Sequence, residues 1–158
     1  MSSMCSVSFA LLVNGVASPF FKSGRGLRQG CPLAPLLFLI VVEGLSRALL
    51  FVKDCGLYHG ITFGNEISLS HVLFVDDIVM VTDGIEQSLS TMYEVLVIFS
   101  KVSQMKINEE KSALYFSNLD EFELITIQNI FTFSVGKIEN GMKYLGFHLK
   151  CWRYLLKD

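Results

Sequence analysis

Two adjacent acidic residues, Asp76 and Asp77, stand between two apolar runs at residues 71–75 and 78–82. Carboxylates in an apolar setting are costly to desolvate, so the pair needs water or a cation. Magnesium prefers oxygen ligands and is often held by one or two protein carboxylates together with substrate phosphates. In phosphoryl and nucleotidyl transfer, two such ions activate the attacking hydroxyl and stabilise the leaving oxygen. The pair therefore predicts a divalent-cation site, although two acids taken alone favour an ordinary solvated turn.

A second candidate is the loop at residues 22–30, KSGRGLRQG, which is rich in glycine and in cations. The planar guanidinium groups of Arg25 and Arg28 suit phosphates, and glycine lets a backbone approach a ligand closely. The plainer interpretation is that this is an ordinary solvated loop. Lys111, which follows two glutamates, can likewise be interpreted as an ordinary surface charge. The histidines show no spacing typical of a metal site. The four cysteines form no C-x-x-C pair, so we expect free thiols in a reducing compartment.

The composition indicates one folded domain without an overall basic surface. The chain has 158 residues, of which 51% are hydrophobic and 18% charged, which is enough apolar material for a core and too much for a disordered chain. The net charge is -2 and the pI is near 5.9. Because phosphate neutralisation supplies much of the affinity for nucleic acid, any such contact must come from local clusters or from other parts of a larger protein.

No membrane or secretion signal is predicted. The longest uncharged apolar run, residues 33–42, is about half of the roughly 20 residues that span a bilayer. Residues 1–13 are mildly apolar but have no basic start, and a turn at Asn14-Gly15 follows, so a signal peptide is not expected. We expect an intracellular protein, cytoplasmic or nuclear, that is not secreted and has no membrane partner.

Turn signals organise the first half of the chain. Asn14-Gly15 between two apolar runs predicts a hairpin. Pro19 places its second strand at a sheet edge or ends it early. Proline opens a helix at residues 35–50 that is apolar on nearly all sides and therefore central. Further strands are expected at residues 61–63, 67–69, 71–75 and 78–82, with turns at Gly64-Asn65 and Asp76-Asp77.

Helical periodicity marks the second half. Apolar residues recur at spacings of three and four along residues 84–102, which predicts an amphipathic helix. Asp83 and Glu86 suggest a capping box at its start. Residues 106–108, 113–117 and 144–149 are expected to be extended and residues 120–130 to form a short helix.

Four blocks of this sequence resemble LINE-type (non-LTR) reverse transcriptases. Residues 26–38, GLRQGCPLAPLLF, resemble the family's R-Q-G-[CD]-P-L-[SA]-P-x-L-F block, which is the most specific of the four. Residues 74–77, FVDD, resemble its aromatic-x-Asp-Asp box. Residues 103–112, SQMKINEEKS, and 143–146, KYLG, are similar to its S-G-x-K-I-N-x-x-K-S and K-Y-L-G blocks. The blocks keep the family's order and cover most of residues 20–149.

The resemblance implies roles for the matching residues. Asp76 would be a ligand of two Mg²⁺ ions, Asp77 would support the site as the adjacent acid, and Lys111 would stand near the leaving pyrophosphate. The partners would be an RNA template, a DNA primer and dNTPs. The residues that would contact the template or the nucleotide are Arg25, Arg28, Gln29 and Gly30. The residues that would form the hairpin holding the primer end are Tyr144, Leu145 and Gly146.

The resemblance also implies the fold. It predicts an α+β partial palm at residues 1–149, with a truncated start of the thumb or a tail at 150–158. A small antiparallel sheet would bear Asp76-Asp77 on a hairpin and pack on two or more helices. The family's x-K-A-F-D-x-V block, which carries another catalytic aspartate, and its fingers are missing. The sheet would then have an open apolar edge, which predicts self-association.

Smaller departures stand within the blocks. Val75 stands where the family often has alanine, and Gln104 stands where the family has glycine.

Three hypotheses follow. The chain descends from an RNA-directed DNA polymerase but is not expected to polymerise alone, because one metal-binding strand is missing. Alternatively, it is a non-catalytic retroelement remnant with at most weak metal or RNA binding. An unrelated α+β binding module with a carboxylate turn is the third, against which the RQGCPL block argues.

Overall fold

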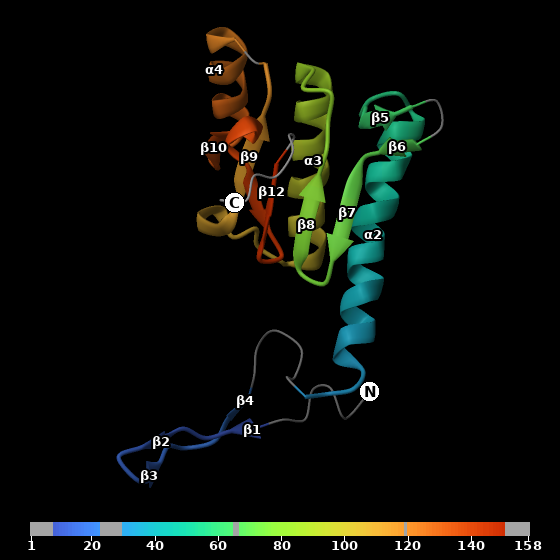
Figure 1. Cartoon of the computed structure of the whole chain (residues 1–158). Coiled ribbons are helices and arrows are strands. Elements are labelled where there is room, and N and C mark those ends of the chain that lie inside the picture. Colours follow the sequence, from blue (N-terminus) through green and yellow to red (C-terminus); the bar gives the residue numbers. More distant parts are fainter. Residues whose placement is uncertain (1–7, 23–29, 65–66, 119, 151–158) are drawn as a thin grey trace. The chain divides into compact units, whose positions relative to one another are not determined.

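The computed structural model describes residues 8–22, 30–64, 67–118 and 120–150. The chain divides into two compact units, Met1–Val42 and Glu43–Asp158, and helix α2 (Ala34–Asp54) crosses the boundary between them. Figure 1 labels the elements of both units.

The first unit contains two short antiparallel ladders. Strand β1 (Ser8–Phe9) pairs with β4 (Phe21–Lys22), and β2 (Leu12–Val13) pairs with β3 (Val16–Ala17). The turn between β2 and β3 is Asn14-Gly15, whose φ angles of 51° and 80° are both positive. A two-residue turn of this kind matches the twist of its strands, and Asn-Gly adopts it readily. The predicted hairpin is therefore confirmed, and Pro19 follows the end of β3 as expected.

Helix α2 is the predicted central helix, and it continues four residues beyond the expected end at residue 50. Gly56, with a φ of 71°, ends it, while the amide of Leu57 donates to the carbonyl of Val52 at 3.0 Å. Glycine in this left-handed conformation is the usual helix terminator. Among the described residues, α2 is the helix long and apolar enough to cross a membrane by length and composition. Its Leu45 and Leu49 are nevertheless fully buried in the protein core.

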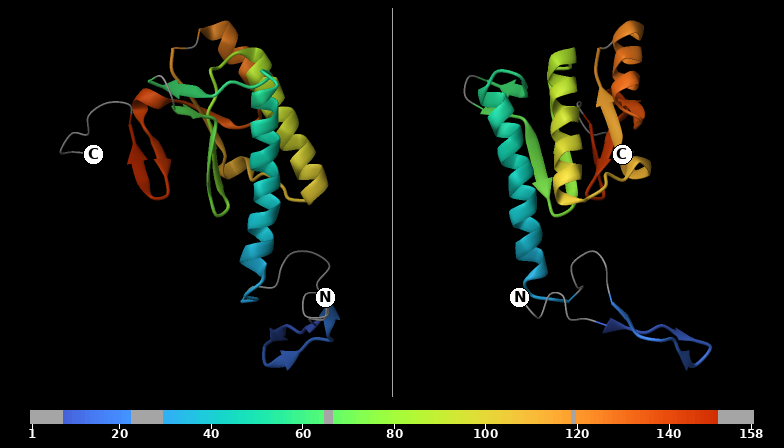
Figure 2. Two further views of the ribbon diagram at one scale, coloured as in Figure 1. Left: turned by 90° about the vertical axis from the view of Figure 1, so that its right-hand side faces the viewer. Right: turned by 180° about the vertical axis from the view of Figure 1, so that it is seen from behind.

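The core of the second unit lies between three helices and the strands that cover them. Helix α3 (Glu86–Ser103) follows the predicted boundaries within two residues, and α4 (Glu121–Ile130) matches the expected short helix. The end of α2 runs beside α3, and the β7–β8 ladder covers one face of this pair (Figure 2). The buried core comprises Leu45, Leu49, Tyr58, Leu89, Met92, Val95, Leu96, Ile127 and Phe131.

The predicted α+β class is confirmed, with the described strands arranged as six two-stranded ladders. Those of the second unit pair as β5 (Ile61–Phe63) with β6 (Ile67–Leu69), β7 (His71–Phe74) with β8 (Asp77–Met80), β9 (Ala113–Phe116) with β10 (Ser134–Lys137), and β11 (Met142–Tyr144) with β12 (Phe147–Leu149).

The β9–β10 pair is parallel, whereas the other ladders are antiparallel. Helix α4 connects the two strands, and such a crossover brings the second strand back in the same direction. Strand β10 was not predicted, because its sequence SVGK contains a glycine and a lysine and lacks a strand signal. Gly136 lies against the ring of Tyr115, so its place is set by a tertiary contact.

Two local predictions about the second half are wrong. Asp83 does not form a capping box, because Gly84 (φ 83°) separates it from the N-cap residue Ile85. Its carboxylate instead accepts from the amide of Ile85 at 3.2 Å. A capping box does occur at α4, between Asp120 and Glu123.

The single strand expected at residues 144–149 is a hairpin, since Leu145 and Gly146 form a turn between β11 and β12. Residues 106–108, expected to be extended, form no strand, and a 3-10 helix η1 (Glu109–Lys111) follows them.

Gly60→Ala is expected to lower the free energy of unfolding by about 1–3 kcal/mol. A Cβ at residue 60 would overlap the carbonyl oxygen of Leu69 and lie 2.9 Å from the Cα of Ser70. Both obstacles are backbone atoms, which cannot rotate away. Urea denaturation followed by circular dichroism measures the change.

Gly44→Ala is the matched control, because residue 44 lies inside α2 with nothing within 4 Å of the added Cβ. It should leave stability unchanged or raise it by about 0.5–1 kcal/mol through helix propensity. Equal effects of the two substitutions would contradict the close packing at Gly60.

Candidate metal site

The Asp76–Asp77 pair sits at the tip of the β7–β8 hairpin, but not as predicted. Phe74 pairs with Asp77 across the ladder, so the two-residue turn consists of Val75 and Asp76. Asp77 is the first residue of β8 rather than part of the turn. The prediction of a turn at both acids was therefore wrong by one residue. A two-residue hairpin loop requires the residues on either side of it to pair. Because Phe74 pairs with Asp77, the loop consists of Val75 and Asp76.

Val75 adopts an unusual backbone conformation. Its φ is 52°, a region that β-branched residues rarely occupy. The first position of a two-residue hairpin turn with positive φ usually holds glycine, asparagine or aspartate. The side chain is 61% exposed, so burial does not compensate for the strain, which is about 1–3 kcal/mol.

Both carboxylates are exposed to solvent. Within the described part of the chain, the side chains of Asp76 and Asp77 form no hydrogen bond or ion pair, and no group of three or more His, Cys, Asp or Glu side chains could hold a metal. The hairpin thus presents two carboxylates that form no ion pair with any described cation. An arrangement of this kind can bind a hydrated divalent cation, but only through these two ligands.

The other end of the hairpin is held by the hydroxyl of Tyr58. This side chain is fully buried, and its oxygen lies 2.7 Å from the carbonyl oxygens of both Ser70 and Val81. Ser70 directly precedes β7 and Val81 directly follows β8, and the amide of Val81 donates to the carbonyl of Ser70 at 2.8 Å. Tyr58 therefore joins the two strands where they leave the hairpin.

The surroundings of Tyr58 disfavour its ionised form. Burial raises the pKa of its hydroxyl to about 12, and the negative charge of Asp83 adds to the rise. The phenol is consequently neutral at physiological pH and can donate its proton.

The side chain of His71, the first residue of β7, forms a second set of hydrogen bonds at the base of the hairpin. Its Nε2 lies 2.8 Å from the hydroxyl of Ser46 on α2, and its Nδ1 lies 2.9 Å from the hydroxyl of Ser70. Burial lowers the pKa of His71, the charge of Lys53 lowers it further, and that of Glu43 acts in the opposite direction. A neutral imidazole has one donor and one acceptor nitrogen, so one serine accepts and the other donates.

No local sequence signal marks Tyr58 or His71 as a support of the hairpin. The two partners of Tyr58, and the Ser46 partner of His71, are 12 to 25 residues away along the chain, and no spacing rule connects them.

The predicted template and nucleotide contacts cannot all be placed. Arg25, Arg28 and Gln29 lie outside the described residues. Gly30 is described and exposed, and its φ of 81° in a turn before α2 is a conformation that glycine adopts freely.

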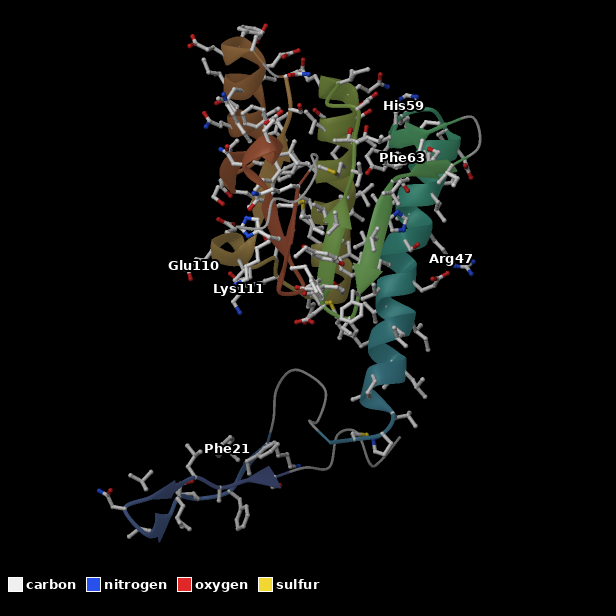
Figure 3. The ribbon with its side chains drawn as sticks, viewed as in Figure 1. Phe21, Arg47, His59, Phe63, Glu110 and Lys111 are labelled. Carbon is white, nitrogen blue, oxygen red and sulfur yellow. The ribbon has the colours of Figure 1, made fainter. Side chains whose placement is uncertain are left out.

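Lys111 lies at the end of η1 and is exposed (Figure 3). Its backbone amide donates to the side chain of Asn108 at 3.2 Å, which closes the short helix. Among the described residues, no hydrogen bond or ion pair joins Lys111 to the side chains of Asp76 and Asp77. The catalytic role of these three residues stays a prediction.

The residues expected to hold the primer end form a hairpin tip. Tyr144 pairs with Phe147, and the turn residues Leu145 and Gly146 have φ angles of 50° and 84°. The hydroxyl of Tyr144 is buried and finds no hydrogen-bond partner among the described residues. A buried hydroxyl normally has a hydrogen-bond partner, so this atom is unusual among the described residues.

Comparisons with known proteins agree with the sequence blocks. Residues 3–149 match the family model described as reverse transcriptase (RNA-dependent DNA polymerase). An uncharacterized mitochondrial protein of Arabidopsis thaliana is 35% identical over 75 residues, which are 47% of this chain and 62% of that protein. A retrovirus-related Pol polyprotein from the type-2 retrotransposable element R2DM of Drosophila melanogaster is 27% identical over 142 residues, covering 85% of this chain and 13% of the relative. The chain thus spans less than two thirds of either relative.

Val75→Gly is expected to raise the free energy of unfolding by about 1 kcal/mol, because glycine relieves the strained turn. Val72→Gly is the matched control: Val72 is also partly exposed on the same hairpin, but it does not have a positive φ. The control should lower stability by about 1 kcal/mol, as glycine weakens a strand. Urea titrations of both variants measure the difference, and a loss in both would argue against strain at Val75.

Tyr58→Phe is expected to lower stability at pH 7 by about 1–3 kcal/mol, since the carbonyls of Ser70 and Val81 lose the one phenol proton that they share. The pH dependence has a definite sign. The folded pKa of about 12 exceeds the ordinary value of 10.0, so this contribution is complete below pH 10 and is lost as the pH rises toward 12.

Thermal melts from pH 7 to 12 should show this alkaline loss diminished in Tyr58→Phe and retained in Tyr93→Phe, whose tyrosine is partly exposed. An unchanged alkaline loss in Tyr58→Phe would contradict the assignment.

Proposed function

We propose that this chain, which belongs to the reverse transcriptase (RNA-dependent DNA polymerase) family, is the palm segment of a non-LTR retrotransposon enzyme that presents an aspartate pair to the catalytic metal ions. The observation that carries the proposal is the Asp76–Asp77 hairpin. Its two carboxylates are exposed at the tip and form no ion pair with a described residue, while buried and part-buried hydrogen bonds from Tyr58 and His71 hold its base. A hairpin held in this way presents both carboxylates at a fixed position.

The donor set fits magnesium in part. Mg²⁺ is commonly held by one or two carboxylates plus substrate phosphates, and the hairpin offers two carboxylates. Bound there, metal ions would supply charge to activate a primer hydroxyl and to stabilise the leaving pyrophosphate. Asp76, in the turn itself, would contact both ions, and Asp77 would support it from the start of β8.

Two carboxylates do not complete a two-metal site. Within the described residues no further acid joins the pair, so the proposal requires a carboxylate from another segment of the same or another polypeptide. We therefore infer that this chain alone does not extend a primer. Template RNA, primer DNA and dNTPs would be partners of the complete enzyme. Contacts to them would come from the loop at residues 25–30, from Lys111 and from the turn at residues 144–146.

The alternative is a non-catalytic remnant of such an enzyme. Two observations favour it over an active enzyme: the strain at Val75 and the exposed apolar side chains beside the carboxylates, of which Phe74 is 54% exposed. Apolar surface of this kind also favours self-association. Both readings place the chain in the same family and differ only in present activity.

The metal-binding part of the proposal predicts weak Mn²⁺ binding at the hairpin tip. Paramagnetic broadening of amide resonances should be strongest around residues 74–78, with a dissociation constant of about 1 mM or weaker. Asp76→Asn combined with Asp77→Asn should abolish it. Glu109→Gln combined with Glu110→Gln is the control, since it removes the same charge from another acidic pair and should leave the hairpin broadening intact.

Broadening that follows the Glu109–Glu110 pair, or that survives the loss of both aspartates, would refute the metal site at the hairpin.

The catalytic part is tested by primer extension on poly-rA with oligo-dT and Mg²⁺ or Mn²⁺. The unaltered chain and Asp76→Asn are both expected to give no product from folded samples. Extension by the unaltered chain that disappears in Asp76→Asn would overturn the inference of an incomplete site and would establish an active enzyme.

A further inference from the structure

A hollow of about 360 Å³ lies on the second unit, away from the Asp76–Asp77 hairpin. The C-terminal half of α3, residues 105–109 and residues 132–133 line it, and none of its lining residues belongs to β7 or β8. Its volume lies at the lower end of the range typical of small-ligand pockets, which is about 300–1,000 Å³. The family-type site assigned above does not use this hollow.

The floor of the hollow is apolar and partly aromatic. Leu96 is buried, and Val97 and Phe133 are half-buried beside it. Tyr93 meets Phe131 edge to face with ring centres 5.4 Å apart, and Phe131 lies 5.5 Å from Phe133. This chain of rings fixes both aromatic walls, and aromatic walls favour a flat ring as ligand.

The rim of the hollow is cationic. Lys101 and Lys106 both line it, and Glu109 is the one carboxylate among its lining residues. The carboxylate of Glu109 accepts a hydrogen bond from the hydroxyl of Thr132 at 3.1 Å, so part of its accepting capacity is already used. The lining therefore carries a net charge of one positive unit, counted as two lysines against one glutamate.

The carbonyl groups at the end of α3 would oppose an anion, but the helix end is capped. The hydroxyl of Ser103 donates to the carbonyl of Phe99 at 2.7 Å, and the left-handed Gln104 turns the chain away. Capping of this kind reduces the negative field of the last helical turn. The two ammonium groups then dominate the charge that a ligand meets at the rim.

We propose that this hollow binds a small aromatic anion, a flat ring that carries one carboxylate or phosphate group. The ring packs against the apolar lining that includes Tyr93 and Phe133, and the acidic group lies at Lys101 and Lys106. A neutral ring lacks the ion pairs at the rim, and an anion without a ring leaves the apolar floor in contact with water. Each half of the ligand therefore contributes separately.

The probe for this site is 2-naphthoate, and the neutral 2-naphthamide is its matched control ligand. Titration of the full chain, followed by amide chemical shifts, should give a dissociation constant of about 1 mM or tighter at low salt. The shifts should map to residues 93–109 and 132–133. The amide is expected to bind about tenfold more weakly, because it lacks the charge.

Two double variants separate the rim from general charge effects. Lys101→Met combined with Lys106→Met should weaken 2-naphthoate binding about tenfold and leave 2-naphthamide binding unchanged. Lys137→Met combined with Lys143→Met removes the same charge from lysines outside the hollow and should change neither. These lysine side chains are exposed, so the variants are expected to fold, and their amide spectra check this.

Three results would overturn the proposal. They are equal affinity for the acid and the amide, binding unaffected by loss of Lys101 and Lys106, and shifts that map to the exposed apolar hairpins instead. No binding at about 1 mM would likewise overturn it.

Discussion

The hydroxyl of Tyr58 is the contact on which the arrangement of the second unit depends. It stands between the end of α2 and β5, and it donates toward the carbonyls of Ser70 and Val81, where the β7–β8 hairpin begins and ends. A fully buried phenol must find a partner, and these carbonyls need a donor once they are removed from water. The same group therefore satisfies the backbone and determines where the hairpin leaves the core.

The contacts around Tyr58 extend this constraint to the helices. The amide of His59 donates to the hydroxyl of buried Ser88 on α3, and the amide of Asp83 donates to the carbonyl of His59. His71 joins β7 to α2 through Ser46. With its base held from both helices, the hairpin can carry an exposed tip where Val75 is strained and two carboxylates repel each other. Strain of this kind persists only when the surroundings over-determine the conformation.

Membership of the reverse transcriptase family gives these features a common explanation. The proposed role as a palm segment would require carboxylates that are free to meet metal ions, and neighbouring segments that cover the apolar strands. The R2DM polyprotein is much longer than this chain, which spans 13% of it. The β7–β8 and β11–β12 hairpins carry exposed apolar residues, and the hydroxyl of Tyr144 has no partner among the described residues. Other parts of a longer protein of this family would cover such surfaces.

The sequence by itself determined the family, the α+β class and most of the local elements, because these depend on short-range signals. Asn14-Gly15 dictated a turn, and the apolar repeat along α3 dictated an amphipathic helix. The capping box at Asp83 and the turn at both acids were predicted wrongly, and β10 was not predicted. Each of these depends on a single residue's backbone angle or on a partner strand brought close by a crossover.

Only the tertiary structure decided what holds the candidate site in place and what lies beside it. Tyr58 and His71 have partners far along the chain, and the hollow between α3 and Phe133 combines segments about 30 residues apart. The aspartate pair could be singled out from the sequence, because it belongs to a short block of adjacent residues that resembles a block of the family. Its support could not, because burial and hydrogen bonding are properties of residues that meet only after the chain has folded.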